Sequence, residues 1–211
     1  MPDNELPALK VFALNCSLRP SESDQESSTD KMIADLLAVM RSHGITGEVE
    51  RAADHHIKPG VMSDMGPGDD WPQLRARILA ADIFILGTPI WLGQPSSVAK
   101  RVLERMDAFL SETDDRSRMP AAGKVALVAV VGNEDGAHAC HAACFQALND
   151  VGFTIPANSG VYWVGEAMQS TNYVDLDKMP DAVASSLATA ASNAAHLARL
   201  LKRWEFPGMP Q

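Results

Sequence analysis

Short apolar runs alternate along the chain with longer stretches in which apolar residues recur every three or four positions. The runs have the length of buried strands, and they cover residues 10–14, 49–52, 83–86, 125–131, and 153–156 resuming at 160–164. The stretches after them have the period of an amphipathic helix, and they lie near residues 29–43, 70–80, 99–110, 137–151 and 180–204. Strand followed by helix, five times over, predicts an α/β protein in which helices cover both faces of a doubly wound, five-stranded parallel sheet.

Three loops are expected to meet at one edge of this sheet. Right-handed crossovers leave few topologies, and five strands fit the spatial order 2-1-3-4-5, in which the first strand is central. The loops that follow the first, third and fourth strands cover residues 15–29, 87–97 and 132–138. Open α/β sheets bind ligands at this edge. The length of 211 residues suits one domain that spans residues 1–211 and has a sizeable core.

The first loop combines hydroxyl groups with one arginine ahead of a helix. Ser27, Ser28 or Thr29 can cap that helix, and the backbone N–H groups of a helix N-terminus bind anions. Ser17, Ser28 and Thr29 offer O–H donors, and Arg19 offers a positive charge. The loop has neither the G-K-[ST] of a Walker A loop nor the glycines of a dinucleotide turn, so it suits a terminal monophosphate. A solvated serine-rich loop that only caps the helix would have the same composition.

The second and third loops suit a flat ring. An indole can stack against such a ring, and glycine beside it lets backbone groups approach the ring edge. The candidate residues of the second loop are Thr88, Pro89, Ile90, Trp91, Leu92, Gly93 and Gln94. The candidates of the third loop, on the opposite side of the ring, are Gly132, Asn133, Glu134, Asp135 and Gly136. The alternatives are that Trp91 packs its loop as a plug and that the third loop is a polar turn without a ligand.

Composition narrows the choice of partners. The formal net charge is -9, and an acidic chain is poorly suited to grip the phosphate backbone of nucleic acid. The longest purely apolar run, residues 125–131, is far too short to span a bilayer. The first ten residues lack the basic start and apolar core of a secretory signal, and the 3 cysteines are unevenly spaced. We therefore expect a cytoplasmic protein without nucleic-acid or membrane partners.

His138, Cys140, His141 and Cys144 form a cluster of potential metal ligands on one predicted helix. The two cysteines share the core-facing stripe of that helix with Leu148, whereas the histidines are rotated off it. A structural zinc site needs about four convergent ligands. We therefore expect no metal site here.

Three segments resemble the NADPH-dependent FMN reductase branch of the flavodoxin-like superfamily, and they cover residues 10–30, 82–110 and 125–143. Ser17-Leu18-Arg19-Pro20, followed by a Ser/Thr-rich helix start, is similar to the S-x-R phosphate loop of that family. Residues 82–93 are similar to its more specific A-D-x-x-x-x-x-[ST]-P-x-[YW]-x-G segment. The chain departs from the family at Cys16, where glycine is frequent, and at Ser28-Thr29, where the family has Asn-Thr.

The resemblance implies a flavodoxin-like fold and an FMN site. Phosphate would be held by Ser17, Arg19, Ser28 and Thr29, and the ring would lie between residues 88–94 and 132–137. Hydride would pass from NAD(P)H through FMN to a small acceptor such as a quinone, a free flavin, or a nitro or azo compound. The flavin carries that chemistry, so no catalytic acid or base is required.

The resemblance also bears on partners and leaves two other functions open. Family members are commonly homodimers, and residues 54–70 and 157–172 are candidates for the subunit boundary. One alternative is an FMN-binding electron carrier or binding module without its own NAD(P)H turnover. A weaker alternative is a scaffold that has lost its flavin.

Overall fold

A parallel sheet forms the centre of the protein in the computed structural model, which describes residues 8–166 and 169–208. The parallel strands occur in the spatial order β2-β1-β3-β5-β6, and the two-residue strand β4 pairs antiparallel with β3 outside this path. The strands are β1 (Leu9–Asn15), β2 (Ile45–Arg51), β3 (Ile83–Trp91), β4 (Gln94–Pro95), β5 (Val125–Gly132) and β6 (Gly160–Val164). With β4 set aside, this is the predicted order 2-1-3-4-5, and the flavodoxin-like α/β fold is confirmed.

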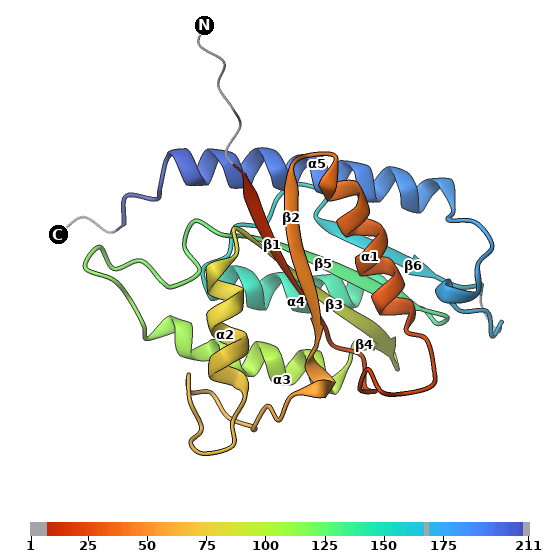
Figure 1. The fold of residues 1–211 in the computed structure, drawn as a ribbon, viewed down its shortest axis with the longest axis horizontal. Coiled ribbons are helices and arrows are strands. Elements are labelled where there is room, and N and C mark those ends of the chain that lie inside the picture. The colour runs from red at the N-terminus through yellow and green to blue at the C-terminus, as the bar shows by residue number, and fades with distance from the viewer. Residues whose placement is uncertain (1–7, 167–168, 209–211) are drawn as a thin grey trace, which may run out of the picture.

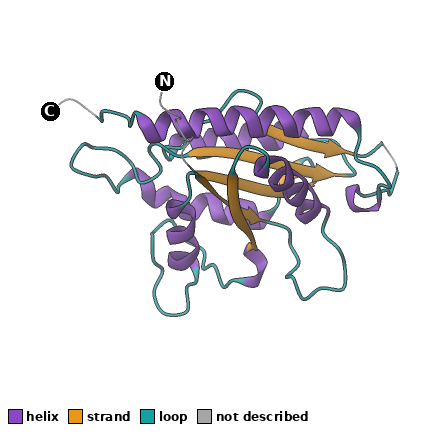
Figure 2. Ribbon diagram, turned by 45° about the horizontal axis from the view of Figure 1, so that its top comes forward, coloured by secondary structure: helices purple, strands orange, loops and turns teal. Residues whose placement is uncertain are grey.

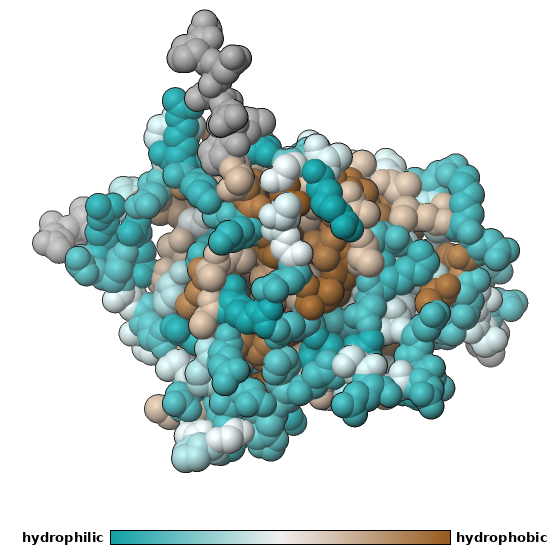
Figure 3. All heavy atoms as spheres, in the orientation of Figure 1, coloured by the Kyte–Doolittle hydropathy of each residue, from teal (hydrophilic) through white to brown (hydrophobic). Residues whose placement is uncertain are grey.

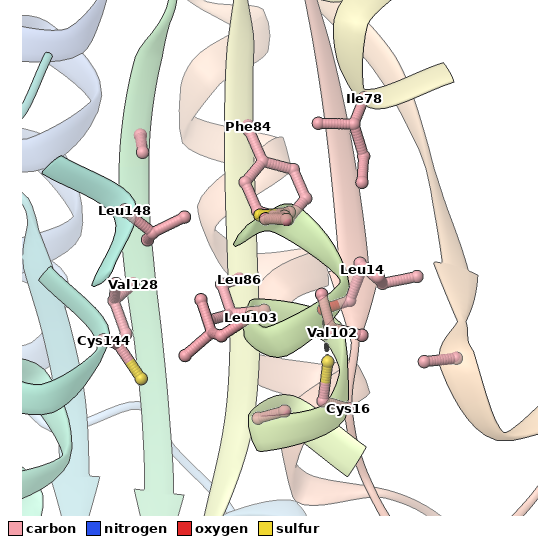
Figure 4. Close-up of a cluster of buried hydrophobic side chains, with 14 of the residues drawn as sticks. Leu14, Cys16, Ile78, Phe84, Leu86, Val102, Leu103, Val128, Cys144 and Leu148 are labelled. Atoms are coloured by element: carbon pink, nitrogen blue, oxygen red, sulfur yellow. Dashed lines mark hydrogen bonds between the residues drawn. The ribbon is translucent and has the colours of Figure 1, made fainter. Parts of the chain in front are cut away.

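Helices cover both faces of the sheet (Figures 1 and 2). The helices are α1 (Ser28–Arg41), α2 (Trp71–Ala80), α3 (Ser97–Met106), α4 (Ala137–Asp150) and α5 (Asp181–Arg203). One core joins the sheet to α1 and α5, and a second core joins the opposite face to α2, α3 and α4. In Figure 4, Leu86 and Val128 of neighbouring strands face Leu103 of α3 and Cys144 of α4. Burial on both faces explains why β3 and β5 are almost continuously apolar.

The edge strand β2 begins at Ile45, so the sequence prediction of a strand over residues 49–52 was wrong in its limits. β2 pairs with β1 residue by residue, from Leu9↔Ile45 to Asn15↔Arg51. Backbone pairing defines this strand, and most of its side chains are exposed or half-buried polar groups. The hydrophobic pattern therefore did not indicate where the strand begins. The face shown in Figure 3 is mostly hydrophilic, with apolar side chains near its middle, between β2 and α1.

Two further predictions of strand limits were wrong. Gly87-Thr88-Pro89, predicted to end a strand, continues β3, because these residues pair with residues 129–131 of β5. The chain then turns through Leu92 (φ 52°) and Gly93 (φ 73°), which connect β3 to β4 as a two-residue hairpin. The run at residues 153–156 contributes one isolated bridge, Val125↔Thr154, and only residues 160–164 form a strand there.

The long loop at residues 54–70 is anchored by a buried ion pair. Arg105 of α3 donates to the Asp69 carboxylate and to the carbonyls of Met62 and Lys58, at distances between 2.7 and 3.0 Å. The side chains of Arg105 and Asp69 are both fully buried. Arg105 therefore fixes the backbone of the loop, while the side chains of Val61 and Met62 in the same loop are exposed. Among the described helices, none has the length and apolar character that crossing a membrane would require.

Candidate functional site

A cavity of about 360 Å³ opens at the carboxyl ends of β1, β3 and β5. It brings together residues from all three predicted loops, although these are far apart in the sequence. The predicted site residues that line it are Ser17, Arg19, Ser28, Thr29, Pro89, Ile90, Trp91, Gly132, Asn133 and Glu134. This is the edge at which open parallel sheets bind ligands.

The other predicted site residues shape the loops and do not line this cavity. They are Thr88, Leu92, Gly93, Gln94, Asp135 and Gly136. Thr88 is fully buried, and its hydroxyl accepts the Ser96 N–H at 3.0 Å and donates to the Pro89 carbonyl at 2.9 Å. Gly136 (φ 126°) lies so close to the hairpin that a Cβ on it would be 2.7 Å from the Cα of Gly93. Hairpin and third loop are thus packed against each other.

Asn15, the last residue of β1, organises the first loop. Its amide oxygen accepts the Ser17 N–H at 2.8 Å, and its amide nitrogen donates to Ser27 Oγ at 3.3 Å. Ser27 is the helix cap, because its hydroxyl accepts the Asp30 N–H at 3.2 Å. The helix therefore opens on Ser28 and Thr29, whose N–H groups belong to the first turn, where intrahelical acceptors are lacking.

The hydroxyl of Ser17 is the unusual atom of this loop. Its Oγ is buried and makes no hydrogen bond within the described structure, although Ser17 lines the cavity. An unpaired buried hydroxyl is costly unless a ligand or water completes it. By contrast, Ser28 Oγ accepts the Val174 N–H at 3.2 Å, so one of its lone pairs is already used. The loop thus places one unpaired hydroxyl and the first N–H groups of α1 in residues that line the cavity.

Trp91 forms one rim of the cavity, and its side chain is 53% exposed. A plug that packs the loop would be buried, so that alternative is wrong. Glu134 ties this rim to the third loop, because its Oε1 accepts the Leu92 N–H at 3.0 Å. Glu134 is also one of the residues that line the cavity. The wall between β3 and β5 therefore combines an indole, backbone groups and one negative charge.

A further wall comes from residues that sequence reasoning missed: Trp163 of β6 and Asn172 and Tyr173 around a short 3-10 turn, Tyr173–Asp175. The rings of Trp163 and Tyr173 lie 5.6 Å apart. The Tyr173 hydroxyl donates to Asp35 at 2.8 Å, and burial followed by this bond raises the pKa of Tyr173 above its usual range. The sequence around residues 165–180 has no regular period, so only the strand signal of residues 160–164 was available.

The cysteines and histidines of α4 lie away from this chemistry. Burial raises the pKa of Cys140 to about 11 and that of Cys144 to about 12, so both stay protonated thiols at neutral pH. Burial also raises the pKa of Cys16. His141 is buried against Phe145 and Tyr162, so its predicted place off the core stripe was wrong. Within residues 8–166 and 169–208, no group of three or more His, Cys, Asp or Glu side chains could hold a metal ion.

The chain is similar to known proteins over most of its length. The family model described as NADPH-dependent FMN reductase matches residues 9–169. A Mycobacterium bovis protein named divalent metal cation transporter MntH is 37% identical over 171 residues, which are 79% of this chain and 25% of that protein. The chain therefore spans about a quarter of that relative's length.

Two further comparisons cover most of both chains. The 8-demethyl-8-aminoriboflavin-5'-phosphate synthase of Streptomyces davaonensis is 32% identical over 205 residues, which are 92% of this chain and 79% of that protein. The crystal structure of RosB with the bound intermediate 8-demethyl-8-formylriboflavin-5'-phosphate has a TM-score of 0.85 and 31% identity, and the match covers 95% of this chain and 82% of RosB.

Proposed function

The chain belongs to the NADPH-dependent FMN reductase family, flavin-dependent oxidoreductases that use FMN with NAD(P)H as the reductant, and we propose that it holds FMN in the cavity at the carboxyl edge of its sheet. The reaction proposed is transfer of hydride from NAD(P)H through FMN to a small acceptor. A quinone, a free flavin, or a nitro or azo compound would suit that role.

The observation that carries the proposal is the unpaired, buried hydroxyl of Ser17 in the cavity wall. A phosphate oxygen would give this O–H the acceptor that the protein does not supply. The N-terminus of α1 lies in the same wall and favours negative charge. Ser17, Arg19, Ser28 and Thr29 would hold the phosphate, so the residues present fit a flavin monophosphate.

The ring would lie toward Trp91 and the third loop. Trp91 and Trp163 both line the cavity and offer faces on which a flat ring can stack. FMN, when bound, supplies the hydride chemistry itself. The protein's residues bind the phosphate, orient the ring and exclude water from one of its sides. The carboxylate of Glu134 would disfavour additional negative charge on a nearby ring.

A second candidate function follows from the two relatives that match over most of their length. One is named a synthase of an aminoriboflavin phosphate, and the other holds a formylriboflavin phosphate in its crystal structure. In this candidate the flavin phosphate in the cavity is the substrate, whose ring is changed, and is not a carrier that is regenerated. The same phosphate loop and ring walls would serve both functions.

One experiment separates these functions. FMN is added to the purified protein, the visible spectrum is recorded, and NADPH is then added without oxygen. Loss of the oxidised flavin bands supports the oxidoreductase, and bound flavin that NADPH and NADH do not bleach favours the electron carrier. The second candidate needs a separate incubation of the protein with FMN and an amino donor in air, because oxidation and amination of the ring need an oxidant and a nitrogen source. Mass spectrometry of the recovered flavin then tests this candidate, which requires a changed mass. Absence of FMN binding would contradict all three functions: the oxidoreductase, the electron carrier and the enzyme that changes the flavin ring.

We also propose a cytoplasmic, single-domain homodimer. The support is family resemblance together with two exposed apolar residues of the 54–70 loop, Val61 and Met62, in a backbone that Arg105 fixes. The described part of residues 157–172 contributes Trp163 and Asn172 to the cavity wall, so it would bring the subunit boundary close to the flavin. Light scattering of Met62→Asp against the unchanged chain tests this, because a charge on this exposed apolar surface should favour monomers.

A further inference from the structure

Arg51 lies beside the proposed phosphate loop, at a position for which sequence reasoning assigned no role. It is the last residue of β2 and stands opposite Asn15 of β1 in the sheet. Its side chain is only 11% exposed, and the residue lines the cavity. Arg51 therefore lies between the edge of the sheet and the proposed phosphate loop.

The guanidinium connects three points of the loop. Nη1 donates to the Arg19 carbonyl at 3.3 Å and to the Pro20 carbonyl at 2.7 Å. Nη2 donates to the carboxylate of Asp30. Since Arg19 and Pro20 lie two and three residues after Ser17, these bonds hold the backbone of the loop that carries Ser17 and Arg19 in the cavity wall. The planar fork of arginine suits several such bonds at once.

Asp30 is the residue that makes the charge of Arg51 important. It is the third residue of α1, in the first turn of the helix whose N-terminus faces the cavity. A carboxylate there competes with an incoming anion for the positive end of the helix, and like charges repel. Asn15 also donates to Asp30, but this amide is neutral. Among the hydrogen bonds described for Asp30, only that from Arg51 brings a positive charge.

We propose that Arg51 is a positioning residue for the flavin phosphate. It holds residues 19–20 in the shape that binds phosphate, and it offsets the Asp30 charge so that the loop accepts a dianion. This inference rests on the proposed function. Its signature is dependence on the phosphate: loss of Arg51 should weaken FMN and leave riboflavin, which has the same ring without phosphate, almost unchanged.

The test is a titration of FMN and riboflavin into the purified chain and its variants, followed by flavin fluorescence. Arg51→Met should weaken FMN by about tenfold, which corresponds to about 1.4 kcal/mol. Riboflavin affinity should stay within about twofold. Adding Asp30→Asn to Arg51→Met should restore part of the lost FMN affinity, because no uncompensated carboxylate remains although residues 19–20 still lack the bonds from Arg51. Arg51→Lys keeps the positive charge but lacks the planar fork of arginine. Its FMN affinity should lie between that of the unaltered chain and that of Arg51→Met.

Arg77→Met is the matched control. Arg77 pairs with Glu48 and Glu50 of the same edge strand, but it does not line the cavity. Its loss should leave the ratio of FMN to riboflavin affinity unchanged. If Arg51→Met does not fold, the FMN affinity of the single variant Asp30→Asn is compared with that of the unaltered chain. Equal or tighter FMN binding supports the inference, and weaker binding overturns it.

The outcomes separate the two proposals. If Arg51→Met weakens FMN and riboflavin equally, or if Asp30→Asn fails to restore FMN binding, the role assigned to Arg51 is overturned while FMN binding itself stands. If the unaltered chain binds neither flavin, the proposed function is overturned, and the role of Arg51 with it.

Discussion

Replacing Ser17 by alanine should have opposite effects on the free protein and on its complex with FMN. In the free protein the Ser17 hydroxyl is buried without a partner. A buried unpaired hydroxyl costs about 1–3 kcal/mol, so its removal should leave the free energy of unfolding unchanged or raise it. In the complex the same hydroxyl would donate to a phosphate oxygen, and a hydrogen bond to a charged group contributes about 1.5–3 kcal/mol. FMN affinity should therefore fall by roughly tenfold to a hundredfold.

The assay has two parts and one control. Urea unfolding of the flavin-free chain measures stability, and titration with FMN and riboflavin measures affinity, with riboflavin expected to be unaffected by Ser17→Ala. Ser27→Ala is the control, because Ser27 caps α1 through the Asp30 N–H and its loss should lower stability by about 1 kcal/mol. A Ser17→Ala chain that is destabilised and binds FMN as before would refute the reasoning.

Three further predictions follow from the cavity and from the anchored loop. Thr29→Asp should weaken FMN by more than tenfold, because Thr29 lies in the first turn of α1 in the cavity wall, whereas the neutral Thr29→Asn should have a smaller effect in the same titration. Trp91→Ala should weaken FMN by about 0.5–1.5 kcal/mol and alter the flavin spectrum, with little change in melting temperature because the side chain is half exposed; a large fall in melting temperature alone would contradict this. Burial acts to raise the pKa of Asp69, but Arg105 and the N–H groups of Met65, Lys58 and Trp71 outweigh it and hold the pKa below its usual range. The ionised carboxylate should therefore contribute fully to stability above about pH 4, and this contribution should be lost as the pH falls toward the lower pKa of the folded chain. In urea unfolding at several pH values, Asp69→Asn should make the free energy of unfolding depend less on pH in the acid range.

The sequence was most informative where burial decides the pattern. β3 and β5 are apolar because they are covered on both faces, and their limits and order follow from that pattern with errors only at the ends. β2 was recognised only in part, because an edge strand is defined by pairing and its exposed positions carry polar residues. The sequence predicted a loop from residue 87, because glycine and proline often end a strand. Pairing with β5 instead continues β3 through Pro89, and the chain turns only at Leu92 and Gly93.

For the candidate site, the sequence located loops better than side chains. Ser17, Trp91 and Glu134 were found because they follow buried strands at one sheet edge. Arg51 was missed because its importance depends on Asp30 and the Pro20 carbonyl, which are near it only in the folded chain. Tyr173 was missed for the same reason, since its partner Asp35 is far away in the sequence. Thr88 was included by motif, but its hydroxyl serves the backbone of the hairpin.

A crystal structure of the protein with FMN would show directly where the flavin phosphate lies. We expect the phosphate within hydrogen-bonding distance of Ser17 Oγ and of the first N–H groups of α1, with the ring between Trp91 and residues 132–134. Electron density for FMN at another place, or a phosphate that leaves Ser17 Oγ without a partner, would contradict it.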